Sequence, residues 1–313
     1  MKKHPLILCA GITSLLLSAC NPVKAPEAIL PVPEAKQVEW QKMETYAFVH
    51  FGLNTFNDRE WGYGDSDPKT FNPTRLDCEQ WVQTFVKSGM KGVILTAKHH
   101  DGFCLFDSKL TDYKSTNAPC GRDLVREFVD AVRAEGLRVG LYYSLIDWHH
   151  PDFPKYNDCN HPMRGDPAYQ DEKIDFDRYL AYMHGQIEEL VTNYGKIDIL
   201  WFDYAYDELR GEAWKATELI RMVRRHQPDV IIDNRLETSG EGFGSLVTEQ
   251  PAYYSGDFVS PEQILPPEGI RNVRGERVPW ELCTTMNNNW GYVPYDTNYK
   301  PASMLIRKLV ECV

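Results

Sequence analysis

The chain has 313 residues, of which 42% are hydrophobic and 12% aromatic, enough for one large domain with a substantial core. Its 34 basic and 45 acidic residues leave a formal net charge of −11, which argues against a nucleic-acid partner. The many aromatic, Asp, His and Asn residues favour a neutral polar ligand such as a sugar.

The N-terminus predicts an export signal. Two lysines precede an apolar run at residues 5–17, and small residues then lead into Cys20. This pattern is typical of a bacterial lipoprotein, so we expect residues 1–20 to be the signal peptide and Cys20 to be lipidated. The protein would then be exported and held on a membrane, facing the periplasm or the outside, by this lipid alone. A transmembrane anchor is the alternative, but the run is shorter than the roughly 20 residues of a membrane span.

Residues 21–37 contain four prolines and predict an extended tether. Six cysteines follow Cys20, with no Cys-x-x-Cys spacing, so neither a zinc ribbon nor a disulfide scaffold is favoured. Most of them are expected to be buried thiols, with one or two disulfides left open.

Apolar strand-like runs then alternate with amphipathic helical segments. Strands are predicted at 46–51, 92–97, 139–144, 197–202 and 230–234, with weaker candidates at 246–250 and 280–285. Helices are predicted at 78–88, 123–135, 174–193, 212–226 and 301–312. This alternation predicts parallel βαβ units. No glycine-rich fingerprint follows a strand, so we favour a (β/α)8-like TIM barrel over a nucleotide-binding sheet.

The strand at 197–202 is almost entirely apolar and ends at Asp203. Catalytic groups of a barrel lie at the C-terminal ends of its strands, although an aspartate there also suits a helix cap. Other strand ends carry chemically capable side chains too: His50, His99, His100, Tyr142 or Tyr143, and Arg235. Five successive ends of this kind predict a site on one rim.

Adjacent His99, His100 and Asp101 also suggest a metal site, and hence a metal-dependent barrel hydrolase. Neighbouring residues of a strand point to opposite faces, so both imidazoles reach one ion only where the strand has ended. No further histidine pair supplies ligands, and we therefore expect no metal. Neutral imidazoles bind sugar hydroxyls without an ion.

Several motifs resemble the retaining α-L-fucosidase family of glycoside hydrolases, in the order of that family. They are Phe-Val-His-Phe-Gly at 48–52, Glu-Trp at 60–61, Thr-Ala-Lys-His-His-Asp-Gly-Phe at 96–103, Gly-Leu-Tyr-Tyr-Ser at 140–144 and Trp-Phe-Asp at 201–203. The resemblance implies a (β/α)8-like catalytic domain over residues 38–313, no cofactor, and a fucosylated oligosaccharide or glycoconjugate as substrate.

By the same resemblance, Asp203 is the nucleophile and Arg235 lies near it. The residues implied to line the fucose pocket are His50, Glu60, Trp61, His99, His100, Tyr142, Trp201 and Trp290. Glu262 resembles the acid/base of one branch of the family, with Glu249 and Glu281 as rivals. Family members continue past the helix at 301–312 into an eighth strand and usually a β-sandwich. We therefore expect a barrel that lacks its last strand, and an inactive fucoside-binding fragment is the alternative to an active enzyme.

Overall fold

The computed structural model describes residues 31–155, 158–161, 163–167, 173–206 and 208–312. The predicted signal peptide and Cys20 lie outside these residues. Pro33–Val313 forms one compact unit. Within the described part of the chain, no helix combines the length and the apolar character that crossing a membrane requires.

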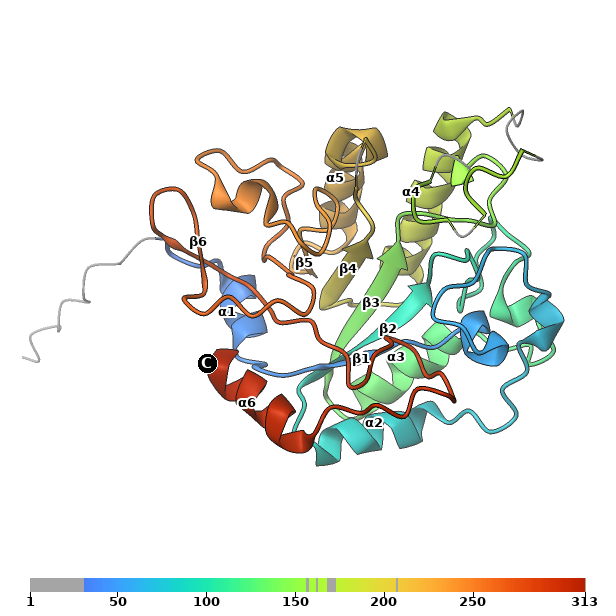
Figure 1. Ribbon diagram of the computed structural model, residues 1–313, viewed down its shortest axis with the longest axis horizontal. Helices are drawn as coiled ribbons and strands as arrows, with labels where there is room; N and C mark the ends of the chain where they lie inside the picture. Colours follow the sequence, from blue (N-terminus) through green and yellow to red (C-terminus); the bar gives the residue numbers. More distant parts are fainter. Residues whose placement is uncertain (1–30, 156–157, 162, 168–172, 207, 313) are drawn as a thin grey trace, which may run out of the picture. The chain divides into compact units, whose positions relative to one another are not determined.

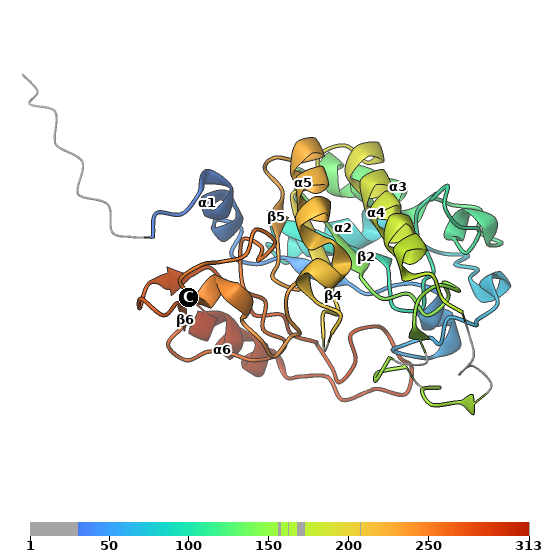
Figure 2. The same ribbon diagram turned by 90° about the horizontal axis from the view of Figure 1, so that it is seen from above.

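A parallel five-stranded sheet forms the centre of this unit, with its strands side by side in chain order. The strands are β1 (Ala47–Val49), β2 (Gly92–Lys98), β3 (Arg138–Ser144), β4 (Ile199–Asp203) and β5 (Ile231–Ile232). Between them run α2 (Cys78–Lys87), α3 (Leu124–Ala134), α4 (Phe176–Asn193) and α5 (Ala216–His226). These helices cover one face of the sheet (Figures 1 and 2), so the predicted α/β fold with parallel strands is confirmed.

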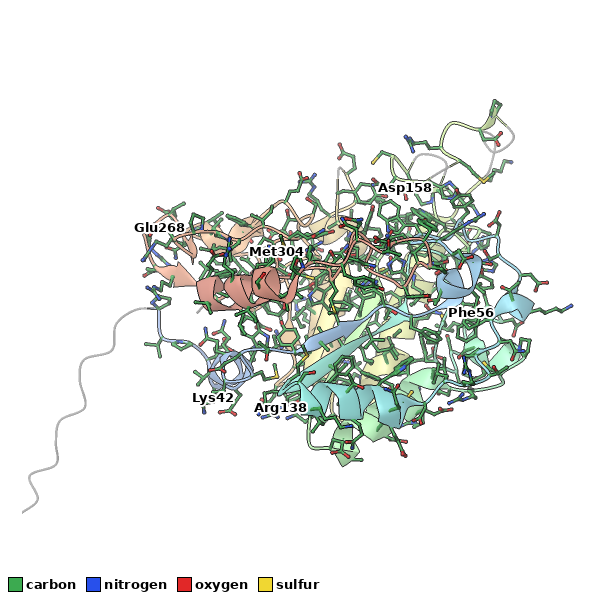
Figure 3. All side chains as sticks on the ribbon, turned by 60° about the horizontal axis from the view of Figure 1, so that its bottom comes forward. Lys42, Phe56, Arg138, Asp158, Glu268 and Met304 are labelled. Atoms are coloured by element: carbon green, nitrogen blue, oxygen red, sulfur yellow. The ribbon has the colours of Figure 1, made fainter. Side chains whose placement is uncertain are left out.

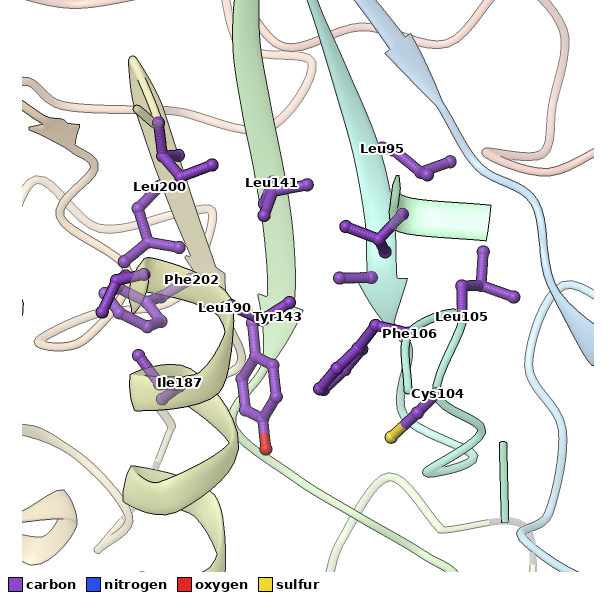
Figure 4. Close-up of a cluster of buried hydrophobic side chains, with 14 of the residues drawn as sticks. Leu95, Cys104, Leu105, Phe106, Leu141, Tyr143, Ile187, Leu190, Leu200 and Phe202 are labelled. Carbon is purple, nitrogen blue, oxygen red and sulfur yellow. The ribbon is translucent and has the colours of Figure 1, made fainter. Parts of the chain in front are cut away.

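Each strand contributes alternate side chains to two separate apolar clusters. On the helix side, Leu141, Leu200 and Phe202 pack with Ile187 and Leu190 of α4 (Figure 4). On the other side lies a second cluster, which contains Ile94, Tyr142, Ile199, Trp201 and Phe258. Asp203 follows Trp201 by two residues, so it belongs to this second, inner side of the sheet.

Aspartates determine where three of the helices begin. The carboxylates of Asp77, Asp123 and Asp175 accept hydrogen bonds from backbone N–H groups in the first turns of α2, α3 and α4. Such caps satisfy donors that have no partner inside the helix. Because the cap is a local feature, the predicted start of each helix agrees with the structure to within two residues.

Two predicted elements near the C-terminus differ from the structure. The strand predicted at 246–250 is wrong: a 3-10 helix, Gly244–Val247, lies there, and it packs against Val259 in a small cluster of its own. Beyond β5 the sheet continues only through single parallel bridges, from Asp233 to Phe258, Val259 to Trp280 and Glu262 to Cys283. The predicted strand at 280–285 is therefore reduced to bridges at its residues 280 and 283. Prolines at 261 and 279 lack the N–H that a longer ladder requires.

The described residues also contain elements that were not predicted. Helix α1 (Ala35–Gln41) begins inside the segment 21–37 that we expected to be extended, so residues 35–37 are helical. Strands β6 (Ile270–Arg271) and β7 (Arg277–Val278) form a short antiparallel hairpin, and a 3-10 turn, Gly211–Trp214, precedes α5 within the predicted helix 212–226.

Helix α6 (Ala302–Cys312) was predicted but has no buried residue, and Met304, labelled in Figure 3, exposes 44% of its surface. The six cysteines of the described segments are all free, and three of them are buried.

Candidate active site

Three side chains from different elements meet at the Asp203 carboxylate, which ends β4 and is 16% exposed. The hydroxyl of Tyr142, on β3, donates to Asp203 Oδ2 at 2.8 Å. Arg235 Nη1 donates to Oδ1 at 3.1 Å, and His100 Nε2 lies 4.0 Å from Oδ2. In the described chain α5 begins only at Ala216, so Asp203 does not cap it and the helix-cap alternative is excluded.

Burial and the neighbouring charges act on Asp203 in opposite directions. Desolvation is the largest influence and raises its pKa, the Glu262 charge raises it further, the Arg235 charge and the Tyr142 hydrogen bond lower it, and the net pKa is about 6. The carboxylate is therefore mostly ionised at neutral pH and becomes protonated in mild acid. An ionised carboxylate with two positioned donors is suited to nucleophilic attack.

The Arg235 guanidinium is fixed on several sides. It is 2% exposed, its Nε donates to the Ser260 carbonyl at 3.0 Å, and it lies 4.8 Å from the centre of the Trp201 ring. Its Nη1 also lies 3.6 Å from Glu262 Oε2. One nitrogen thus contacts the carboxylates of both Asp203 and Glu262.

Among the three candidate acids, Glu262 is the one beside Asp203. Its side chain is 40% exposed, and its Oε1 accepts from Trp290 Nε1 at 3.1 Å. Glu281 instead accepts from Trp201 Nε1 at 2.7 Å, and burial raises its pKa to about 8. Glu249 is exposed. Geometry therefore favours Glu262 as the partner of Asp203.

Imidazoles form one wall of the site. Strand β2 ends at Lys98, so His99 and His100 follow the strand, and their ring centroids lie only 4.1 Å apart. Burial lowers the pKa of His99 to about 3 and holds the pKa values of His50 and His100 well below their usual range. All three rings are consequently neutral. No group of three or more His, Cys, Asp or Glu side chains in the described ranges is arranged to hold a metal ion.

The loop carrying Trp290 closes the other side. Glu60 Oε1 accepts from the Trp290 backbone N–H at 2.6 Å, and the Trp290 ring stacks on His50 at 5.6 Å. Trp61 lies edge-on to His100 at 5.5 Å. Together with Tyr142, which stacks on Trp201, every residue predicted for the site is therefore brought into one continuous set of contacts.

Tyr143 is excluded from this set. Its hydroxyl donates to Gln186 Oε1 of α4 at 2.8 Å, on the helix side of the sheet. Because side chains alternate along a strand, only one of the two adjacent tyrosines can face Asp203. The structure selects Tyr142.

Three contributors to the site were missed. Phe48 lies edge-on to Trp201 at 5.4 Å, Tyr204 lies 4.3 Å from the His100 ring, and Ser144 contacts His100. Phe48 and Ser144 could have been found from alternation, since each is two residues from a predicted site residue on its strand. Tyr204 has a φ of 81°, and Gln263, after Glu262, has a φ of 55°. Left-handed backbone at non-glycine residues is costly and clusters at functional sites.

Comparison with known proteins identifies relatives of one kind. The family model described as Alpha-L-fucosidase matches residues 28–313. Alpha-L-fucosidase 1 of Arabidopsis thaliana is 39% identical over 215 residues, which cover 66% of this chain and 38% of that protein. The human plasma alpha-L-fucosidase is 28% identical over 282 residues, covering 88% of this chain and 54% of that protein. This chain thus spans less than two thirds of the length of either relative.

The solved structures that resemble this chain are also alpha-L-fucosidases. Alpha-L-fucosidase isoenzyme 1 from Paenibacillus thiaminolyticus superposes with a TM-score of 0.82 at 50% identity, covering 88% of this chain and 67% of that one. The Lactobacillus casei alpha-L-fucosidase in complex with its α-L-fucose product gives a TM-score of 0.72 at 26% identity, covering 89% and 88%.

Proposed function

We propose that this chain, which belongs to the α-L-fucosidase family of glycoside hydrolases, removes terminal α-L-fucose from glycans with retention of configuration. The observation that carries the proposal is the shared contact of Asp203 and Glu262 with Arg235 Nη1, at 3.1 and 3.6 Å. The two oxygens cannot be farther apart than these distances together. This limit, which holds for Asp203 Oδ1 and Glu262 Oε2, is compatible with the roughly 5 to 5.5 Å between the carboxyl groups of retaining enzymes.

In the proposed mechanism Asp203 attacks the anomeric carbon and forms a covalent fucosyl ester. Glu262 gives its proton to the departing glycosidic oxygen and then takes one from the water that hydrolyses the ester. Arg235 and Tyr142 hold the Asp203 carboxylate in position through the hydrogen bonds described above. No cofactor is needed for either step.

In this proposal the sugar is recognised by the imidazole and aromatic side chains that line the site. The neutral imidazoles of His50, His99 and His100, with the Glu60 carboxylate, would bind the hydroxyl groups of fucose. The aromatic wall of the site is formed by the inner cluster of the sheet, where Phe48 packs beside Trp201 and Tyr142. These rings offer an apolar surface for the C6 methyl group, which distinguishes L-fucose from L-galactose.

The location of the enzyme is a separate proposal. The sequence pattern before Cys20 supports export followed by lipidation of that cysteine, which would hold the enzyme on a bacterial membrane with its substrate outside the cytoplasm. The substrate would then be a free fucosylated oligosaccharide or a glycoconjugate at the cell surface.

The roles of the two carboxylates can be separated with an aryl α-L-fucoside and azide. Asp203→Ala should abolish hydrolysis, and azide should restore turnover with β-L-fucosyl azide as product, because azide attacks the substrate directly. Glu262→Ala should retain turnover of a substrate with a good leaving group, and azide should then trap the ester as α-L-fucosyl azide.

Glu249→Ala is the matched control, since Glu249 is an exposed loop glutamate, and its rate should be unchanged. A folded parent chain that binds fucose without cleaving the aryl fucoside would refute the activity. Equal loss of activity in the Glu249 and Glu262 variants would refute the assignment of the acid.

A further inference from the structure

We propose that Ser144 is a positioning residue that fixes the His100 ring as the tautomer protonated on Nδ1, which leaves Nε2 as a hydrogen-bond acceptor beside Asp203. The inference rests on the proposed function, because the Nε2 lone pair would accept a hydrogen bond from the bound sugar. It concerns a side chain that the sequence motifs did not assign to the site.

The tautomer follows from proton counting. Ser144, the last residue of β3, is fully buried, and its Oγ lies 3.0 Å from the Ile146 carbonyl oxygen and 2.7 Å from His100 Nδ1. A carbonyl oxygen can only accept, so the single hydroxyl proton of Ser144 is used there. The contact with His100 is then satisfied only if Nδ1 carries the hydrogen and donates it to Oγ.

A buried ion pair holds the carbonyl in place. Lys98 Nζ donates to the same Ile146 oxygen at 3.0 Å and lies 3.2 Å from Asp147 Oδ2, and both charged side chains are fully enclosed. Asp147 Oδ1 in turn accepts from the backbone N–H groups of the next two histidines along the chain. Because the carbonyl is fixed on this side, Ser144 cannot turn its hydroxyl proton toward His100 without placing an Oγ lone pair against the Ile146 oxygen 3.0 Å away, an unfavourable contact between two acceptors.

The consequence for the site concerns the gap between His100 Nε2 and Asp203 Oδ2, which lie 4.0 Å apart. Burial keeps the imidazole neutral, so a proton on Nδ1 means a lone pair on Nε2. His100 Nε2 and Asp203 Oδ2 are then both hydrogen-bond acceptors, so a ligand group that contacts them must be a hydrogen-bond donor. A sugar hydroxyl next to the reacting carbon supplies one. The opposite tautomer would instead direct Nε2–H at the carboxylate and weaken it as a nucleophile.

The test reads the tautomer directly. In the nitrogen-15 NMR spectrum of the full chain, the His100 signals are assigned by their loss in His100→Gln, and the wild-type Nε2 should be the unprotonated nitrogen. Ser144→Ala should mix the tautomers and lower kcat/KM for an aryl α-L-fucoside on the order of tenfold. Ser144→Thr keeps the hydroxyl and should restore both readouts.

Ser115→Ala is the matched control, because Ser115 is also fully buried and donates to a carbonyl, that of Arg122, at 2.7 Å. A proton on Nε2 in the wild type would overturn the inference, and so would a Ser144→Ala variant whose tautomer and rate are both unchanged. The wild-type spectrum requires neither turnover nor a folded variant. An inactive chain with an unprotonated Nε2 would therefore refute the proposed activity and leave the tautomer assignment supported.

Discussion

At the scale of single residues, the reactivity of this site depends on how one arginine and one aspartate are placed. Burial raises the pKa of Asp203, and the Arg235 charge is the largest influence in the opposite direction. Arg235 is itself enclosed and held by the Ser260 carbonyl, so its charge acts at short range with little water between. The pH at which the carboxylate ionises therefore reflects mainly the balance between burial and the Arg235 charge.

Replacing Arg235 with Met should move the acidic limb of the activity profile to higher pH. The folded-state pKa of Asp203 is about 6, Arg235 lowers it, and its removal therefore raises it further, so activity begins to fall at a higher pH as acid is added. The measurement is kcat/KM for an aryl α-L-fucoside as a function of pH. The acidic limb of this profile reports the pKa of Asp203 in the free enzyme.

Arg138→Met is the matched control for this change. Arg138 begins β3 and pairs with Asp198 at the other end of the strands from Asp203, so its loss should leave the limb in place. If the acidic limb of the pH profile is unchanged in the Arg235 variant, or moves to lower pH, the electrostatic role of Arg235 is contradicted.

At the scale of elements, capping aspartates do more than start helices. Asp123 Oδ1 accepts from Arg126 N at 2.9 Å at the start of α3, while its Oδ2 accepts from the Tyr194 hydroxyl at 2.7 Å, just after α4 ends. The carboxylate thus joins two helices that cover the same face of the sheet. Asp77 caps α2 through Gln80 N at 3.0 Å, and no tyrosine hydroxyl of the described residues donates to its carboxylate.

Asp123→Ala should therefore lower the free energy of unfolding more than Asp77→Ala does. Losing a cap costs about 1 kcal/mol, and Asp123 additionally leaves the Tyr194 hydroxyl without its acceptor, which costs about 1 to 3 kcal/mol where the group is buried. Asp123→Asn should recover only part of the loss, since its single amide oxygen can cap α3 but its NH2 group cannot accept from the Tyr194 hydroxyl. Urea denaturation of the three variants measures this, and equal destabilisation by both alanine changes would show that the tyrosine bond contributes nothing.

At the scale of the whole molecule, the compact unit that carries the candidate active site is separate in sequence from the predicted point of membrane attachment. The compact unit begins at Pro33, and the predicted lipidation site lies before it, at Cys20. A second cysteine, Cys9, lies inside the apolar run of the predicted signal and offers a matched comparison.

Cys20→Ser should release the protein from the membrane fraction of a bacterial host and abolish incorporation of labelled palmitate. The reason is that the thiol of Cys20 is the proposed point of lipid attachment. Cys9→Ser should change neither result. Membrane association that survives the Cys20 change would show that another segment holds the protein.

Features that depend only on residues close together in the chain could be predicted from the amino-acid sequence. Asp203 at the end of an apolar strand, the helix starts near residues 78, 123 and 174, and the motif around His99 and His100 are all local, so they could be predicted from the sequence. The alternation of strands and helices likewise predicted the parallel sheet, because each βαβ unit is built from consecutive residues.

The tertiary structure alone decided what depends on residues far apart in the chain. It placed Tyr142 rather than Tyr143 at Asp203, and it brought Glu262 to the same arginine nitrogen. It has a 3-10 helix, Gly244–Val247, where a strand was predicted at 246–250, and the sheet continues instead through single bridges at residues 258, 259 and 262. Those pairings depend on contacts across the sheet, which a short apolar run does not specify, since such a run can also bury its side chains in a small separate cluster, as Leu246 and Val247 do.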